Sequence, residues 1–160
     1  MNNFLPDPDA SKRDLYISLA ESAEAITDGE RDAIANMANV AALLWQFVPH
    51  LNWAGFYRVI EGELVLGPFM GKPACIRIAF GSGVCGTAAA RGTTQLVPDV
   101  HAFPGHIACD SESRSELVVP VLREGKVIAV IDLDSPIHAR FDLEDAAGVE
   151  ALARVIASRI

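Results

Sequence analysis

The chain has 160 residues, of which 51% are hydrophobic and 21% charged, as expected for a globular protein with one ordinary core. Its formal net charge of −8 argues against nucleic acid as a partner, because binding phosphates requires a basic surface. No apolar run approaches the roughly 18 residues that cross a bilayer, and the N-terminus lacks the pattern of a secretory signal. We therefore expect a cytoplasmic protein without a membrane partner, in a compartment where thiols stay reduced.

Apolar residues recur at helical spacing near both ends of the chain. The spacing predicts N-terminal helices over about residues 10–48 and a C-terminal helix over about 142–159. The turn-forming pair Asp28-Gly29 divides the first region into two helices. Asp142 is well placed to cap the first turn of the last helix.

The middle of the chain, over about residues 51–135, carries strand-like segments and the loops in which we expect an active site. Two hairpins are the clearest features, WAGFYRVIEGELVLGPF and LVVPVLREGKVIAVIDLD, each with a charged, glycine-containing turn. Hairpins with helices at both ends predict an α+β fold, in which one antiparallel β-sheet is flanked by the N- and C-terminal helices. The sequence between the hairpins predicts a strand-like run over 74–80, a short helix over 84–90, a short strand over 94–97 and a loop over 98–114.

Three cysteines, at positions 75, 85 and 109, are an odd number with wide spacings, which argues against a disulfide framework. Cys109 lies in the polar segment GHIACDSESRSELVVPV, in a predicted loop, where functional groups tend to concentrate. Cys85 follows GSGV at the start of a predicted helix, where the helix dipole lowers the pKa of a thiol. The local sequence leaves both open as a nucleophile. The plainer alternatives are a small packed residue at 85 and a surface thiol at 109.

A group of carboxylates is predicted on one face of the second hairpin. Asp132 and Asp134 are two residues apart on a strand, so their side chains point to the same face. Glu116 starts the preceding strand, and the hairpin brings it toward them. Clustered carboxylates raise one another's pKa, so that one can stay protonated near neutral pH. The alternative is a strand end that emerges into solvent.

Two aromatic residues of the first hairpin, Trp53 and Tyr57, are four apart and share a face if the segment is extended. Ordinary core packing is the plain alternative for both.

The sequence offers little support for a metal or a cofactor. His101 and His106 lie near Cys109, but their spacing is not that of a zinc site. The glycine-rich turn at 81–83 lacks the lysine of a phosphate-binding loop. We therefore expect neither a metal nor a bound cofactor.

Four segments, NWAGFYRV, GPFMGKPACIRIAFGSGVCGTAA, HIACDSESRSELVVPV and IAVIDLDSP, resemble the free methionine-(R)-sulfoxide reductases in their order and spacing. These are small stand-alone GAF-domain enzymes, and the resemblance covers about residues 40–158. It implies a single GAF-like domain over residues 1–160. It also implies reduction of free L-methionine-(R)-sulfoxide to L-methionine through a cysteine sulfenic acid and an intramolecular disulfide, which thioredoxin or a similar dithiol recycles.

The resemblance also implies roles for individual residues. Cys109 matches the nucleophile, Cys75 the main resolving cysteine and Cys85 a second resolving candidate.

Whether two copies form a homodimer through the N-terminal helices is left open. The alternative function is that of a non-catalytic GAF module that senses a small molecule, although a sensor would not need three cysteines beside facing carboxylates. The resemblance places five residues around the substrate: Trp53 and Tyr57 as an aromatic cage for its methyl group, and Glu116, Asp132 and Asp134 as the lining of its pocket.

Overall fold

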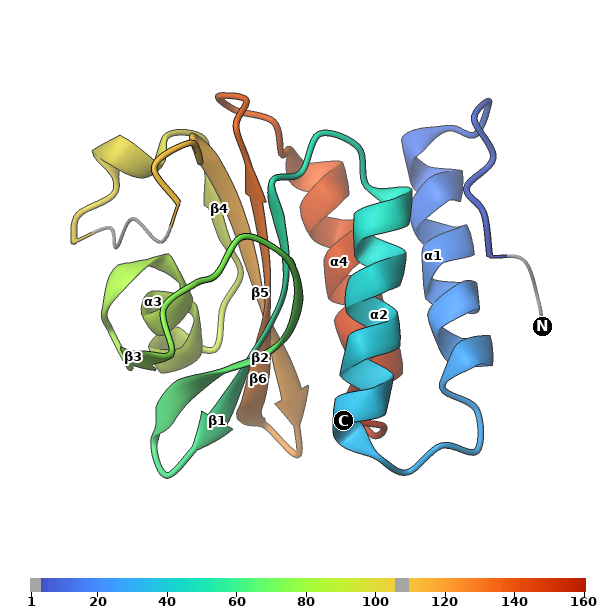
Figure 1. Ribbon diagram of the computed structural model, residues 1–160, viewed down its shortest axis with the longest axis horizontal. Coiled ribbons are helices and arrows are strands. Elements are labelled where there is room, and N and C mark those ends of the chain that lie inside the picture. Colours follow the sequence, from blue (N-terminus) through green and yellow to red (C-terminus); the bar gives the residue numbers. More distant parts are fainter. Residues whose placement is uncertain (1–3, 106–109) are drawn as a thin grey trace.

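A six-stranded antiparallel sheet forms the middle of the protein, in the strand order β3-β2-β1-β6-β5-β4 (Figure 1). The computed structural model describes residues 4–105 and 110–160. The two predicted hairpins form as β1–β2 and β5–β6, and the pairing of β1 with β6 joins them into one sheet. The strands are β1 Trp53–Ile60, β2 Glu63–Gly71, β3 Arg77–Ala79, β4 Gln95–Val97, β5 Ser115–Arg123 and β6 Lys126–Ser135.

Helices cover both faces of the sheet, with α1, α2 and α4 on one side and α3 on the other (Figure 1). On the first side, α2 and α4 lie against the sheet, and α1 lies outside them. On the second side, α3 packs against β5 and β6. The described helices are α1 Lys12–Ile26, α2 Ala33–Phe47, α3 Gly83–Arg91 and α4 Leu143–Ile156, with a short 3₁₀ helix, η1, at Val100–Ala102.

The alternation of side chains along β5 and β6 divides the core into two clusters. Leu117, Val119 and Ile131 belong to the cluster beneath α2 and α4. Val118 and Val130, at the intervening positions, belong to the cluster beneath α3. Because side chains alternate with a period of two, each strand supplies both clusters.

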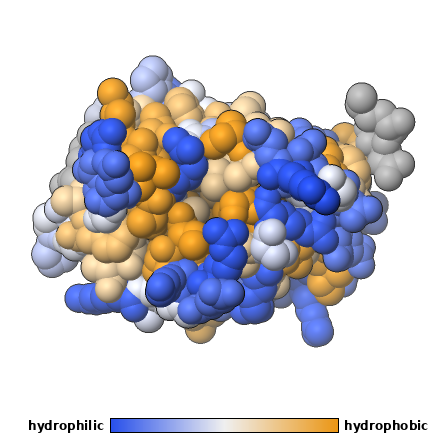
Figure 2. All heavy atoms as spheres, turned by 90° about the horizontal axis from the view of Figure 1, so that it is seen from below, coloured by the Kyte–Doolittle hydropathy of each residue, from blue (hydrophilic) through white to orange (hydrophobic). Residues whose placement is uncertain are grey.

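Within the described part of the chain, every helix is too short or too polar to cross a bilayer. Figure 2 shows hydrophobic side chains interspersed with hydrophilic ones over the face seen from below. Scattered apolar residues of this kind are ordinary on a folded protein.

The structure confirms the predicted α+β class and the N-cap of the last helix. Asp142 accepts from the backbone N–H of Glu144 and Asp145, and the Asp145 side chain accepts in return from the N–H of Asp142. The strand predicted over 74–80 is shorter than expected, since regular pairing is confined to Arg77–Ala79. Pro73 precedes that segment and has no N–H to donate to a ladder.

A buried carboxylate connects the outer helix α1 to α4. Asp145 is fully buried, and its Oδ1 accepts a 2.9 Å hydrogen bond from the Tyr16 hydroxyl. Lys12 Nζ lies 2.9 Å from Asp145 Oδ2, and Arg140 Nη1 lies 3.2 Å from the same carboxylate. The two cations compensate the buried charge, so α1 is held by specific polar contacts as well as by apolar packing.

The packing of Tyr16 on Gly148 gives a first prediction. A Cβ built on Gly148 would lie 2.2 Å from Tyr16 Cγ. Gly148→Ala should therefore lower the free energy of unfolding by about 1–3 kcal/mol, the usual cost of overpacking. Without this contact, alanine in a helix interior would stabilise by about 1 kcal/mol relative to glycine. Urea denaturation of both proteins measures the difference.

The control is the same substitution in a Tyr16→Ala background. With the ring removed, Gly148→Ala should become neutral or stabilising. Equal destabilisation in both backgrounds would contradict the predicted contact.

Candidate active site

Three carboxylates lie on one face of the sheet because they occupy alternate positions on paired strands. Asp132 and Asp134 are two residues apart on β6, and Glu116 of β5 lies directly opposite Asp134. Residues Leu117 and Leu133, between them, point into the core beneath α2 and α4. The prediction that the three carboxylates share a face is therefore confirmed.

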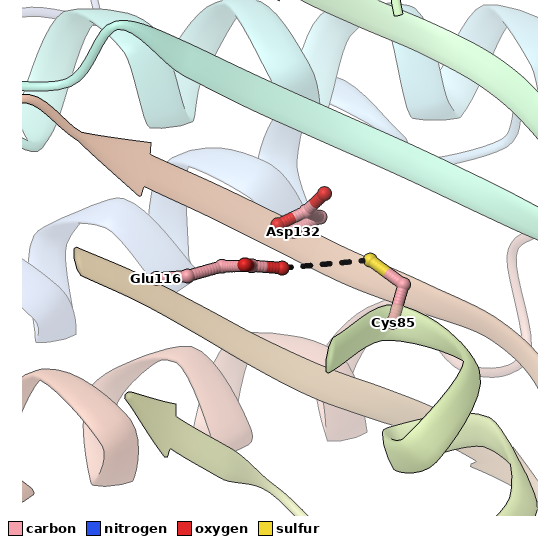
Figure 3. A group of neighbouring side chains, drawn as sticks. All are labelled: Cys85, Glu116 and Asp132. Atoms are coloured by element: carbon pink, nitrogen blue, oxygen red, sulfur yellow. Dashed lines mark hydrogen bonds between the residues drawn. The ribbon is translucent and has the colours of Figure 1, made fainter. Parts of the chain in front are cut away.

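Helix α3 covers this face and brings Cys85 against the carboxylates. Gly86 allows the close approach, because a Cβ there would lie 2.4 Å from the carbonyl oxygen of Ala79. The Cys85 thiol donates a hydrogen bond to Glu116, with 3.9 Å between Sγ and Oε1 (Figure 3). Cys85 is 4% exposed, so this contact is shielded from bulk water.

Cys85, Glu116 and Asp132 form a compact cluster beside a small cavity. One Sγ or carboxylate oxygen from each residue lies within 4.8 Å of the others. The cavity measures about 30 Å³, and its lining also includes Tyr57 and Asp134. A larger hollow of about 550 Å³ lies far from this cluster, beside the N-terminal segment and the end of α2. We place the candidate site at the smaller cavity because the clustered acidic groups and the buried thiol meet there.

Burial dominates the acid–base behaviour of the carboxylates. It raises the pKa of Glu116 well above the ordinary range, and the charges of Asp132 and Asp134 raise it further. Burial raises the pKa of Asp132 to about 6, although hydrogen bonds from Cys85 and Glu116 oppose the shift. Burial and the Asp132 charge also raise the pKa of Asp134. Asp132 is only 6% exposed, so the alternative of a strand end in solvent is wrong for this residue, and Asp134 is partly buried.

The pKa of the Cys85 thiol is not lowered, as its place at a helix start had led us to expect, but raised. Burial raises the pKa of the Cys85 thiol well above its usual value, and the nearby charges of Asp132 and Glu116 raise it further. These effects outweigh the lowering expected from the helix dipole, because the thiol is desolvated and faces negative charge. The structure therefore argues against Cys85 as a thiolate nucleophile.

Aromatic rings from β1 and β2 stack beside the carboxylates. The Trp53 and Tyr57 rings lie 5.9 Å apart, and Phe69 stacks on the other side of Trp53 at 5.2 Å. Trp53 is directly opposite Asp134 in the pairing of β1 with β6. Sequence reasoning missed Phe69, whose register position opposite Gly55 depends on a bulge in the hairpin.

Both aromatic residues also fix the segment that carries Cys75. The indole Nε1 of Trp53 donates to the Lys72 carbonyl at 3.1 Å, and the Tyr57 hydroxyl donates to the Cys75 carbonyl at 3.0 Å. Cys75 is partly buried. Cys109, the predicted nucleophile, lies outside the described residues, as does His106.

A polar group that sequence reasoning missed lies at the edge of the cavity. Asn52 Nδ2 donates to Asp110 Oδ2 at 3.2 Å and to Ser113 Oγ at 3.0 Å. Lys72 forms ion pairs with Asp110 and Glu112. These contacts join residues from three separate segments, so the local sequence carries no signal for them beyond the polar run after Cys109.

The comparisons with known proteins agree with this arrangement. Residues 19–160 match the GAF domain family. The chain is 46% identical to the free methionine-R-sulfoxide reductase of Escherichia coli, over 89% of this chain and 86% of that protein. A structure of free methionine-R-sulfoxide reductase from Neisseria meningitidis, in complex with its substrate, is 45% identical with a TM-score of 0.92 and covers 97% of this chain and 93% of that one. This chain belongs to the free methionine-R-sulfoxide reductase family of GAF-domain proteins.

Membership in this family confirms the resemblance seen in the four sequence segments. A structure from Burkholderia vietnamiensis, described as that of a candidate GAF sensor protein, is 58% identical with a TM-score of 0.90 and covers 94% of this chain and 96% of that one. The GAF fold therefore does not by itself separate an enzyme from a sensor, and the function is inferred from the residues of the site.

The raised pKa of Asp132 gives a second prediction. The pKa of Asp132 is 3.8 when unperturbed and about 6 in the fold, so the folded state favours the protonated side chain. The free energy of unfolding is therefore highest below pH 4 and falls as the pH rises through 6. Asp132→Asn should therefore raise the free energy of unfolding by roughly 2–3 kcal/mol at pH 8, since each pKa unit corresponds to about 1.4 kcal/mol. The gain should vanish at pH 4, as measured by chemical denaturation at both pH values.

Asp142→Asn is the matched control, because it replaces a carboxylate whose pKa is shifted the other way. Hydrogen bonds from Lys12 and from the backbone of Asp145 lower the pKa of Asp142, so its loss should destabilise the protein at pH 8. The same sign for both variants at pH 8 would show that burial does not set the ionisation of Asp132.

Proposed function

We propose that this protein reduces free L-methionine-(R)-sulfoxide to L-methionine. The observation that carries the proposal is the buried set of Glu116, Asp132 and Asp134 beside a stacked pair of aromatic rings. Such a site supplies what a free amino acid sulfoxide requires, namely negative charge for the ammonium group and an acid for the sulfoxide oxygen. Membership in a family that includes reductases of free methionine-R-sulfoxide supports this substrate.

The reaction that we propose begins with attack by the Cys109 thiolate on the sulfoxide sulfur. The oxygen passes to the cysteine as a sulfenic acid, and methionine leaves with its sulfur reduced by two electrons. A second thiol then attacks the sulfenic acid, which releases water and forms a disulfide. A dithiol donor of the thioredoxin type reduces this disulfide and returns both cysteines to thiols.

The carboxylates provide the protons and the charge for this reaction. Glu116 is the first candidate for the acid, because burial and the neighbouring charges raise its pKa and so favour its protonated form. Asp132 and Asp134 would then bind the substrate ammonium, which favours their ionised forms. Free methionine sulfoxide needs more room than a cavity of about 30 Å³, so the side chains at its rim must move outward when it binds.

The aromatic rings are placed to contact the substrate methyl group. Tyr57 lines the cavity, and Trp53 stacks beside it. The face of an aromatic ring favours the partial positive charge that develops on sulfur during attack. We infer that Trp53 and Tyr57 act as one aromatic wall, fixed by their hydrogen bonds to the chain at Lys72 and Cys75.

Cys75 is the resolving thiol that we propose. It is partly buried rather than enclosed, and the Tyr57 hydroxyl holds its backbone near the aromatic wall. Cys85 is a weaker second candidate, since its buried thiol resists ionisation. A thioredoxin partner, a cytoplasmic location and association of two copies through the N-terminal helices stay predictions.

The direct test of the function is incubation with separated R and S forms of free methionine sulfoxide and a dithiol reductant, with methionine as the readout. We expect product from the R form and little from the S form. N-acetylated methionine-(R)-sulfoxide is the matched control substrate, and it should turn over poorly because it lacks the ammonium that the carboxylates would bind. Absence of product from the free R form would refute the proposed function.

The three cysteines can be separated by single-turnover measurements. Cys109→Ser should abolish methionine formation completely, because it removes the attacking thiolate. Cys75→Ser should still release about one equivalent of methionine per enzyme, since attack precedes disulfide formation. Its recycling by thioredoxin should fall sharply, and Cys85→Ser should show the mildest defect.

Quenched single-turnover methionine release, with thiol counts before and after, distinguishes these outcomes. Loss of the first equivalent in Cys85→Ser together with its retention in Cys109→Ser would assign attack to Cys85 instead.

A further inference from the structure

Acidic groups predominate among the described residues that line the cavity beside Cys85. Among the described residues that line it, the titratable side chains are those of Cys85, Tyr57 and four carboxylates, and none is lysine, arginine or histidine. Lys72 pairs with one of these four carboxylates, Asp110, and with Glu112. A cation bound in the cavity would compensate the negative charge of the lining acids that ionise.

A second observation points to a ligand at the same place. Oδ1 of Asp132 is buried and has no hydrogen-bond partner among the described residues, and the residue is only 6% exposed. Buried carboxylate oxygens normally accept a hydrogen bond or coordinate a cation. Asp132 lines the cavity, so its carboxylate is placed to contact an ion bound there.

The three groups nearest one another are the ligand types that zinc binds. Cys85 offers a thiol, and Glu116 and Asp132 each offer a carboxylate oxygen, all within 4.8 Å of one another (Figure 3). At ordinary zinc–sulfur and zinc–oxygen distances, ligand atoms in a tetrahedral site lie roughly 3.3–3.8 Å apart. Magnesium and calcium are poor candidates, because both prefer oxygen ligands to sulfur.

We propose that Cys85, Glu116 and Asp132 form a binding site for a zinc ion that excludes the sulfoxide substrate. The ion would displace the proton of the Cys85 thiol and take its place beside the two carboxylates, with its fourth position open to water. It is an inhibitor and not a cofactor, because it occupies carboxylates that would otherwise hold the substrate. Only this competition rests on the proposed function, and the binding of the ion does not.

Cobalt is the spectroscopic probe for the test, since it replaces zinc and gives a thiolate-to-metal charge-transfer band. Titration of the reduced, metal-free protein with Co²⁺ should produce this band with about one equivalent, and Zn²⁺ should displace it. The band should be lost in Cys85→Ser and retained in Cys75→Ser and Cys109→Ser. A band that survives in Cys85→Ser, or that disappears in Cys75→Ser, would overturn the assignment.

Variants of the two carboxylates provide an independent test of the site if circular dichroism shows that Cys85→Ser does not fold. Glu116→Gln and Asp132→Asn should each weaken Co²⁺ binding at least tenfold while the thiolate band persists at high cobalt concentration. Unchanged affinity in both variants would refute the site.

Competition with the substrate separates this inference from the proposed function. Free methionine-(R)-sulfoxide should raise the cobalt concentration needed for half-saturation. Cobalt binding without reductase activity would leave the metal site standing and remove the function. Reductase activity without cobalt binding would remove only the metal site.

Discussion

The pairing of β6 with both β1 and β5 is the constraint on which the site depends. It fixes the register that sets Asp134 between Trp53 on one side and Glu116 on the other. The same register buries the intervening leucines beneath α2 and α4. A slip of one residue would exchange the two faces and place the carboxylates in the apolar core, so the hydrophobic pattern itself holds the acidic groups in position.

The site is maintained at a cost to stability. Burial disfavours ionisation of Glu116, Asp132 and Asp134, and no basic side chain among the described residues lining the cavity offsets it. Elsewhere in the same protein, the buried Asp145 is compensated by Lys12 and Arg140. The contrast is in keeping with a cavity whose negative charge a bound ligand balances, and with the trade between stability and activity seen at functional sites.

Much of this could be predicted from local patterns. The helical periodicity, the two hairpins and the N-cap at Asp142 depend on neighbouring residues, and the shared face of Asp132 and Asp134 depends only on strand alternation. The acidity of Cys85 could not be predicted, because its position at a helix start gives no information about its burial beneath the sheet. The contacts of Asn52 with Asp110 and Ser113 could not be predicted either, because they join segments that meet only in the folded chain.

We infer that burial keeps a carboxyl group of the cluster protonated at neutral pH. Infrared difference spectroscopy between the wild type and Glu116→Gln at pH 7 tests it directly, through the carbonyl stretch of a protonated carboxylic acid. We expect this band in the wild type and a weaker band in Glu116→Gln, because burial and the neighbouring charges raise the pKa of Glu116 well above its ordinary range. A wild-type spectrum that shows only ionised carboxylates at pH 7 would contradict it.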